Sequence, residues 1–158
     1  MCPPPGPRGR KDTVSRWALA AGFRTSEMTN SFQCCVVTPE RRAIEQPVDF
    51  VALPLYDGEI GIGRDHAPLI GRLGFGEIRL RQGGRIRRYY VDGGFVQVAD
   101  NQVTVLTSDV VPVEEIDEAS AREQLDQARK LPYATPVEEL LRERALARAR
   151  ALVRAAHR

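Results

Sequence analysis

The sequence has no run of about 18 uncharged apolar residues, the length that a membrane-spanning helix needs. We therefore expect any membrane association to occur through a partner. Net charge is also small, because 23 basic and 21 acidic residues leave a formal charge of +2, so the composition does not indicate a nucleic-acid-binding protein. The 158 residues, 42% of them hydrophobic, suffice for the core of one domain with an appendage, whereas two full domains would be crowded.

Cysteine is scarce as well. Two of the three cysteines, Cys34 and Cys35, are adjacent, and adjacent side chains on a strand point to opposite faces. This pattern disfavours a disulfide framework and indicates buried, unreactive thiols in a reducing compartment. The sequence contains no Cys-x-x-Cys or His-x-x-x-His spacing, so it predicts neither a metal site nor a bound cofactor.

The N-terminal segment differs in composition from the rest. Residues 1–27 are rich in proline, glycine and arginine and lack the apolar core of a secretory signal. We predict that residues 1–30 form a disordered extension. An organellar transit peptide would also be rich in arginine, but Asp12, Glu27 and weak amphipathicity speak against it. Met28 directly precedes the patterned sequence. An alternative interpretation is that the upstream segment is dispensable or results from the choice of start site.

Hydrophobic residues from position 32 to about 111 recur with the period of a β-strand. β-branched and aromatic runs alternate with glycine and asparagine, which accept the positive φ angles of tight turns. The predicted strands are 32–38, 48–56, 77–82, 85–91, 94–100 and 102–108. Short strands at this spacing are typical of an antiparallel sandwich or barrel, and we assign residues 31–112 to a β-sandwich domain.

The remaining residues have the composition of two helices. Residues 114–130 carry acids at their start and bases at their end, the charge order that complements a helix dipole. Thr135, Pro136 and Glu138 then form a capping box with proline at the first helical position. Because the connection between them is short, we predict an antiparallel helical hairpin over residues 113–158.

The second predicted helix has one apolar stripe, and alanine makes up much of it. The stripe consists of Leu141, Ala145, Leu146, Ala149, Leu152, Val153 and Ala156. Alanine contributes far less apolar area than leucine, so we expect the hairpin to dock weakly on its neighbour. A competing surface can release an element that is held by few kcal/mol, which is the property of a moving part.

Three motifs precede the helices in a fixed order. They are Gly58-Glu59-Ile60-Gly61-Ile62, His66-Ala67-Pro68-Leu69, and Gly93-Gly94-Phe95 with the later run Val103 to Leu106. In these motifs, their spacing and their place ahead of a two-helix tail, the chain resembles the epsilon subunit of the F-type ATP synthase. The resemblance covers about residues 31 to 128 by motif, and the second helix by position and character.

The resemblance implies a role in the central stalk of a rotary motor. It implies a non-catalytic β-sandwich subunit that binds the gamma subunit and rests on the membrane ring of c subunits. This subunit would couple the rotor to the ring for proton-driven ATP synthesis, while its helical tail restrains ATP hydrolysis. It would be peripheral, on the cytoplasmic face of the bacterial inner membrane.

The resemblance also assigns partner contacts to particular residues. The turn with Glu59 and Gly61 would face the c ring, with Glu59 as a polar contact, and His66 in the following loop would belong to the partner-facing surface. The basic residues of the terminal helices would face an acidic segment of the catalytic beta subunits. These residues are Arg142, Arg144, Arg148 and Arg150.

One departure from the family pattern concerns nucleotide binding. Some members bind ATP through Ile/Leu-Asp-x-x-Arg-Ala at the start of the first terminal helix, and the matching residues here are Ile116, Asp117, Ser120 and Ala121. A serine hydroxyl cannot supply the cationic, multi-donor clamp that a phosphate favours. We therefore expect no ATP sensing, with Arg122 as the nearby residue that could partly substitute.

Two other function classes stay open at this point. A free-standing β-sandwich binding module with a helical tail would show the same periodicities, but it would remain monomeric when mixed with a gamma subunit. A small hydrolase would use Asp65, His66 or Asp92, although no motif places a nucleophile near them. Measuring ester, phosphate and nucleotide turnover on the isolated chain would identify an enzyme.

Overall fold

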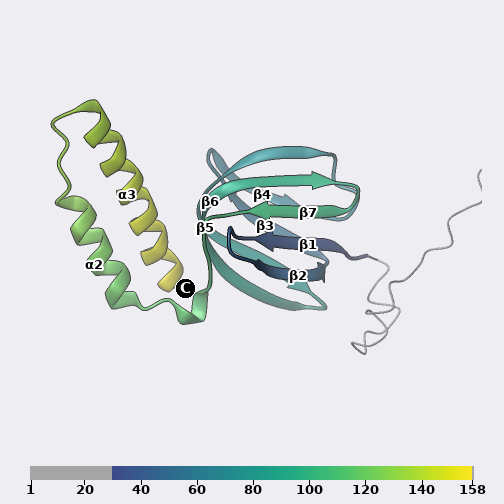
Figure 1. The fold of residues 1–158 in the computed structure, drawn as a ribbon. Coiled ribbons are helices and arrows are strands. Elements are labelled where there is room, and N and C mark those ends of the chain that lie inside the picture. The colour runs from purple at the N-terminus through teal and green to yellow at the C-terminus, as the bar shows by residue number, and fades with distance from the viewer. Residues whose placement is uncertain (1–29, 158) are drawn as a thin grey trace, which may run out of the picture.

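The computed structural model describes residues 30–157, so Cys2 and all but the last residue of the predicted extension (1–30) lie outside the described residues. Strands come first and helices last, and the two helices stand beside the sandwich (Figure 1). This arrangement confirms the predicted β-sandwich with a C-terminal helical hairpin. Over the described residues, none of the helices is long and apolar enough to span a bilayer.

Eight strands form the sandwich. They are β1 (Phe32–Val37), β2 (Arg42–Val48), β3 (Phe50–Leu55), β4 (Gly58–Ile62), β5 (Leu69–Gln82), β6 (Arg85–Ala99), β7 (Gln102–Leu106) and β8 (Val110–Pro112). Hydrogen bonding connects them in the order β2-β1-β7-β6-β5-β3-β4, and β8 pairs with β6. The β1–β7 pair is parallel and the other pairs are antiparallel. The sequence pattern had not predicted β2, β4 or β8, it began β5 too late, and it divided β6 into two strands.

The hydrophobic core of the sandwich is built by strand residues. Its buried members are Phe32, Cys34, Val36, Val48, Val51, Leu53, Ile62, Leu73, Ile78, Leu80, Val91, Val96, Val98, Val103 and Val105. Within residues 30–157, none beyond Val110 belongs to this cluster or packs at its margin. Cys34 and Cys35 are free and buried, as predicted, and burial followed by the neighbouring Cys35 raises the pKa of the Cys34 thiol to about 12. The sandwich therefore closes its core without the helices.

Strand β6 bends at its double glycine. Gly93 has a φ of +68° and Gly94 a φ of +114°. A Cβ at Gly94 would lie 1.8 Å from the carbonyl oxygen of Leu106, whereas a Cβ at Gly93 would make ordinary contact with the Phe75 ring at 3.6 Å. Gly94 is therefore the point where the backbones of β6 and β7 pass too closely for any side chain.

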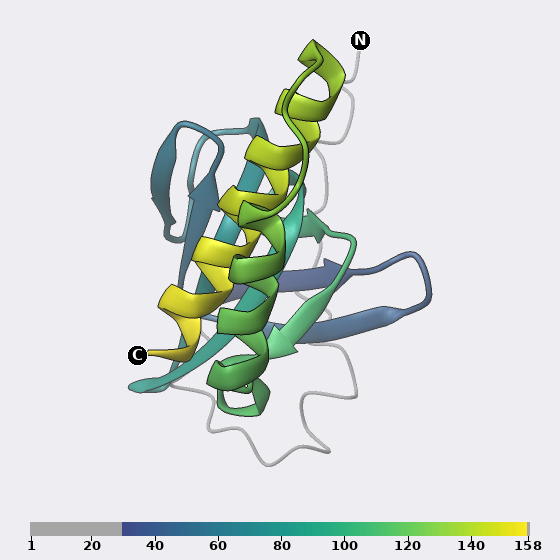
Figure 2. The same ribbon diagram turned by 90° about the vertical axis from the view of Figure 1, so that its left-hand side faces the viewer.

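The C-terminal part begins with a 3₁₀ turn, η1 (Val113–Glu115), and continues with helices α2 (Glu118–Arg129) and α3 (Pro136–Ala156). The first helix starts later than predicted, because Ile116 is extended and packs beside the sheet. The predicted capping box of α3 is present: the Thr135 hydroxyl accepts from the backbone N–H of Glu138 at 3.2 Å, and the Glu138 carboxylate accepts from the backbone N–H of Thr135 at 3.1 Å. Figure 2, viewed from the helical side, shows the hairpin crossing in front of the sheet.

Candidate functional site

An ion pair ties α3 to the sheet. Arg148 Nε donates a 2.9 Å hydrogen bond to Oδ1 of Asp92, the residue just before the glycine bend of β6. The Asp92 side chain is 14% exposed, and that of Arg148 is 45% exposed. The backbone N–H of Asp92 donates to the Thr107 hydroxyl and to the Asp109 carbonyl, both at 3.1 Å. Hydrogen bonds therefore fix the backbone that carries the carboxylate, while the guanidinium that binds it remains about half exposed to solvent.

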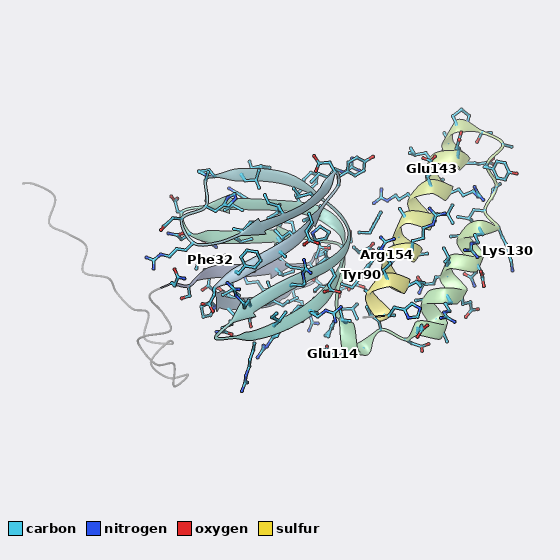
Figure 3. The ribbon with its side chains drawn as sticks, turned by 180° about the vertical axis from the view of Figure 1, so that it is seen from behind. Phe32, Tyr90, Glu114, Lys130, Glu143 and Arg154 are labelled. Carbon is cyan, nitrogen blue, oxygen red and sulfur yellow. The ribbon has the colours of Figure 1, made fainter. Side chains whose placement is uncertain are left out.

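The apolar contact beside this ion pair is small. Tyr90 of β6 is 2% exposed and packs against Ala151 and Ala155 of α3, which are 2% and 3% exposed. The contact is bordered by Phe75, Ile116 and Leu152. In Figure 3, Tyr90 lies on the side of the sheet that faces α3, whereas Lys130 marks the far side of the hairpin. Burial under the helix, and next the Asp92 carboxylate, raises the pKa of the Tyr90 hydroxyl.

The two helices are joined by a separate cluster. Ala128 of α2 packs with Leu146 and Ala149 of α3, and Leu125 and Ala145 lie at the edge. Helix α3 thus uses two faces, one for α2 and one for the sheet, and the hairpin has internal packing of its own. The predicted single stripe was therefore incomplete.

Two corrections to that stripe follow from this arrangement. Leu141 is 60% exposed, so the predicted stripe is not buried along its whole length. Ala151 and Ala155 are buried although the stripe did not include them, because they form the second face.

An apolar patch lies on the sandwich surface. We use this name for Ile70, Phe95 and Leu106, which are 78%, 57% and 51% exposed. They come from the adjacent strands β5, β6 and β7, and Phe95 is directly opposite Leu106 in the register. Sequence reasoning missed this patch. The alternation that puts Val96 and Val98 inside could have shown that Phe95 points outward.

The turn between β3 and β4 presents the predicted c-ring contact. Glu59 is on the surface, with 59% of its side chain exposed, and forms an ion pair with Arg79 of β5. Gly61 pairs with Ala52 in the adjacent strand, and a Cβ at Gly61 would lie 2.6 Å from the tip of the Phe50 ring. The turn is therefore a polar, exposed point on a strand pair in which a side chain at position 61 would have to displace the Phe50 ring.

Asp65 and His66 do not form an acid-base dyad. Asp65 is paired with Asn101: its backbone N–H donates to Asn101 Oδ1 at 2.7 Å, and Asn101 Nδ2 donates back to Asp65 Oδ1 at 3.0 Å. The Nδ1 atom of His66 lies 2.8 Å from the carbonyl oxygen of Ala67. The two Asp65–Asn101 hydrogen bonds join the loop after β4 to the turn between β6 and β7, whereas the His66 contact stays within the loop.

The four arginines assigned to a partner surface point in different directions. Arg142 lies 4.8 Å from the centre of the Tyr133 ring, near the connection between the helices. Arg144 lies 5.9 Å from the centre of the Phe75 ring, on the side of the sheet. Arg150 is exposed, and the fourth arginine is the one bound to the sheet carboxylate. In the docked hairpin they therefore do not form one basic face.

The residues that match the ATP motif are engaged in the fold. The Asp117 carboxylate caps α2 by accepting from the backbone N–H of Ser120 at 3.0 Å. Ala121 is buried, and Ile116 borders the contact with the sheet. Arg122 pairs with Glu118 at 2.5 Å. Over residues 30–157 the structure shows no group of three or more His, Cys, Asp or Glu side chains that could hold a metal ion.

Comparisons with known proteins agree with this description. The family model described as the ATP synthase, Delta/Epsilon chain, beta-sandwich domain matches residues 31–113. The ATP synthase epsilon chain of Rhodopirellula baltica is 46% identical over 125 residues, which cover 79% of this chain and 98% of that relative. The ATP synthase epsilon chain of Desulfitobacterium hafniense is 38% identical over 130 residues, which cover 82% and 98%.

Two solved structures share the fold. A chain of the Euglena gracilis mitochondrial ATP synthase, in a structure of OSCP, F1 and the c-ring, aligns with a TM-score of 0.73 at 25% identity, over 80% of this chain and 82% of that chain. A chain from the central stalk and c-ring of the Tetrahymena thermophila mitochondrial ATP synthase aligns with a TM-score of 0.65, over 78% of this chain and 95% of that chain. At 14% identity, the second likeness concerns the fold alone.

Proposed function

Since the chain belongs to the delta/epsilon family of the ATP synthase, as an epsilon chain, we propose that it is a non-catalytic rotor subunit that couples the gamma subunit to the c ring. The Euglena neighbour is described together with F1 and the c-ring, and the Tetrahymena neighbour with the central stalk and c-ring. ATP chemistry then belongs to the partner subunits. The protein reaches the cytoplasmic face of the bacterial inner membrane only through the complex.

The apolar patch carries this proposal. Three large apolar side chains, each more than half exposed, lie together on adjacent strands of one sheet face. A contiguous exposed apolar surface of this kind marks a protein interaction site. We assign it to the gamma subunit, and His66, in the loop before β5, stays a proposed partner contact.

The exposed turn with Glu59 is assigned to the c ring. Its carboxylate is bound to Arg79 at the surface, where an ion pair in water is weak and can be exchanged for a contact with a partner. Gly61, two positions further along β4, leaves room for the Phe50 ring. The turn thus presents the Glu59 carboxylate at the surface for a polar contact with the c ring.

The helical hairpin is assigned the restraint of ATP hydrolysis. Its contact with the sandwich consists of one ion pair and a small apolar cluster, in which Tyr90 packs against two alanines and Phe75, Ile116 and Leu152 form the border. A contact of this size suits an element that leaves its docked position. When the hairpin is released, its arginines face the acidic segment of the catalytic beta subunits. These residues are Arg142, Arg144, Arg148 and Arg150.

Deletion of residues 113–158 tests the role of the hairpin. The sandwich core has no contribution from these residues, so the truncated chain should fold and join the stalk. The ATP hydrolysis rate of the assembled enzyme should rise. If hydrolysis stays unchanged, the hairpin has no restraining role and the subunit only couples the rotor to the ring.

The substitution Phe95→Asp tests the patch. A charge in the centre of the patch should weaken binding to the gamma subunit by about tenfold or more. Ile86→Asp is the matched control, because Ile86 is also an exposed apolar residue of β6, at 61%, but lies near the far end of the strand. Co-purification with gamma and c-ring subunits gives the readout. Equal incorporation of the two variants would contradict the assignment, and a chain that never joins gamma would be a free-standing binding module.

A further inference from the structure

We propose that the end of the β5–β6 hairpin binds the headgroups of an anionic phospholipid surface. This basic tip consists of Arg81 near the end of β5 and of Arg85, Ile86 and Arg87 at the start of β6. Its position beside a membrane rests on the proposed function, whereas its affinity for anionic lipid is a property of the isolated chain.

The arginines of the basic tip carry charge that the fold does not neutralise. All three are exposed, and within residues 30–157 none of them forms an ion pair with a carboxylate. Arg87 donates to a neutral group, the side-chain oxygen of Gln46, at 3.3 Å. Arg79, two residues before Arg81 on β5, is by contrast bound to Glu59. The charges of the basic tip are therefore available to an anionic partner.

An exposed apolar side chain lies among these arginines. Ile86 is 61% exposed and is directly opposite Arg81 in the strand register, so both side chains point to the same face of the hairpin. Arg85 and Arg87 point to the other face, because side chains alternate along a strand. A lipid surface matches both features, since guanidinium groups bind its phosphates while an apolar side chain enters the layer beneath them. A soluble polyanion or free phosphate would match the arginines alone.

Asp49 holds the basic tip in a fixed conformation. Its backbone N–H donates to the Arg81 carbonyl at 2.7 Å, and its carboxylate accepts from the backbone N–H of Gly83 at 2.8 Å. The guanidinium of Arg81 also lies over the Phe50 ring, 5.2 Å from its centre. Binding to a surface therefore orders less of the chain than a flexible loop would require, which lowers the entropic cost of binding.

The basic tip continues the surface that we assign to the c ring. Arg79, which binds the Glu59 carboxylate, and Arg81 are on the same face of β5, about 7 Å apart along the strand. A subunit that rests its Glu59 turn on a membrane-embedded ring therefore brings the basic tip toward the lipid beside that ring. The cytoplasmic leaflet carries anionic headgroups, which attract basic segments close to the surface.

Vesicle sedimentation with the full isolated chain tests this proposal. The chain should bind vesicles made of phosphatidylcholine and phosphatidylglycerol in equal parts, and should bind vesicles of phosphatidylcholine alone far more weakly. The triple variant R81Q/R85Q/R87Q should weaken binding to the anionic vesicles about tenfold or more, since each basic residue near such a surface contributes about fivefold. Failure of the native chain to bind the anionic vesicles would overturn the proposal.

The matched control is the triple variant R41Q/R129Q/K130Q. It removes the same number of charges from exposed sites outside the basic tip. Vesicle binding should change by less than about threefold, because at ordinary salt a charge acts over only about 10 Å. All variants keep residues 1–29, so the arginines of that segment are present in each of them. Equal losses in the two triple variants would mean that net charge governs the binding, and would overturn the assignment to the basic tip.

The substitution Ile86→Ser distinguishes a lipid surface from other polyanions. It should weaken binding to the anionic vesicles about tenfold, because the apolar side chain that enters the lipid layer is lost, and should leave binding to polyphosphate unchanged. Unchanged vesicle binding of I86S would indicate a site for polyanions in general and would overturn the assignment to lipid.

The assignment to the stalk is tested separately. Phe95→Asp should keep its vesicle binding, and the chain with R81Q/R85Q/R87Q should still join the gamma subunit, because the two surfaces share no residue. A failed lipid contact and a failed assignment to the stalk therefore give different results.

Discussion

Replacement of Gly94 by alanine should destabilise the sandwich strongly, because its Cβ would lie 1.8 Å from the Leu106 carbonyl oxygen. That is roughly half an ordinary contact distance of about 3.5 Å. Strand β7 must then move away, at a cost of about 1 kcal/mol for each weakened hydrogen bond, and the φ of +114° adds about 1–3 kcal/mol. We expect the free energy of unfolding to fall by about 3–5 kcal/mol in total. This is a large share of the roughly 5–15 kcal/mol by which typical domains are stable.

Two other glycines, Gly93 and Gly63, provide controls in the same urea denaturation experiment. Gly93→Ala has a φ of +68° and only an ordinary contact with Phe75, so it should cost about 1–2 kcal/mol for the left-handed backbone alone. Gly63→Ala meets no atom within 4 Å and should change stability by less than about 1 kcal/mol. If G94A is no less stable than G93A, the close approach of β6 and β7 is not what requires glycine.

Three further outcomes are expected. Glu77→Gln should lower the free energy of unfolding by about 1.5–3 kcal/mol, because it breaks the bidentate, part-buried pair with Arg88. By contrast, Glu45→Gln at an exposed ion pair should cost less than about 1 kcal/mol, and urea denaturation compares the two. Cys34 should not react with iodoacetamide at pH 8 until the chain is unfolded, since its pKa is raised to about 12 by burial; labelling of the folded chain, seen by mass spectrometry, would contradict this. Calorimetric titration with millimolar ATP should show little binding. Micromolar affinity would mean that other residues compensate for the absence of arginine at position 120.

The fold could be predicted where local chemistry and periodicity agree. The capping box at Thr135 depends on residues close together in the sequence, and the structure confirms it. The glycine and asparagine residues between the predicted strands likewise adopt positive φ angles at 83–84 and 101. Strand β5 was predicted from residue 77 although it begins at 69, because three glycines in this stretch weaken the strand pattern. Strand β2 escaped prediction because it lies at the sheet edge, where its mostly part-buried residues do not alternate cleanly.

The candidate site was less predictable, since it depends on contacts between distant residues. Asp92 and Arg148 are 56 positions apart, and no local pattern pairs them. The buried face of Ala151 and Ala155 could not be separated from the stripe facing α2, because both faces contain alanine and the sequence does not say how many neighbours a helix has. The prediction that the hairpin is weakly docked came from alanine content alone, and it stays a prediction until the opening is measured.

A core made of strand residues alone also affects how the protein can change over generations. A substitution in α2 or α3 does not disturb the packing of Val36, Leu53 or Ile78, so it escapes the penalty that usually purges changes near a core. The helical hairpin is thereby free to vary in length and charge to suit a particular enzyme, while the sandwich keeps its fold. Positions 75, 90 and 92 of the sandwich are exceptions, because their side chains also contact the helices.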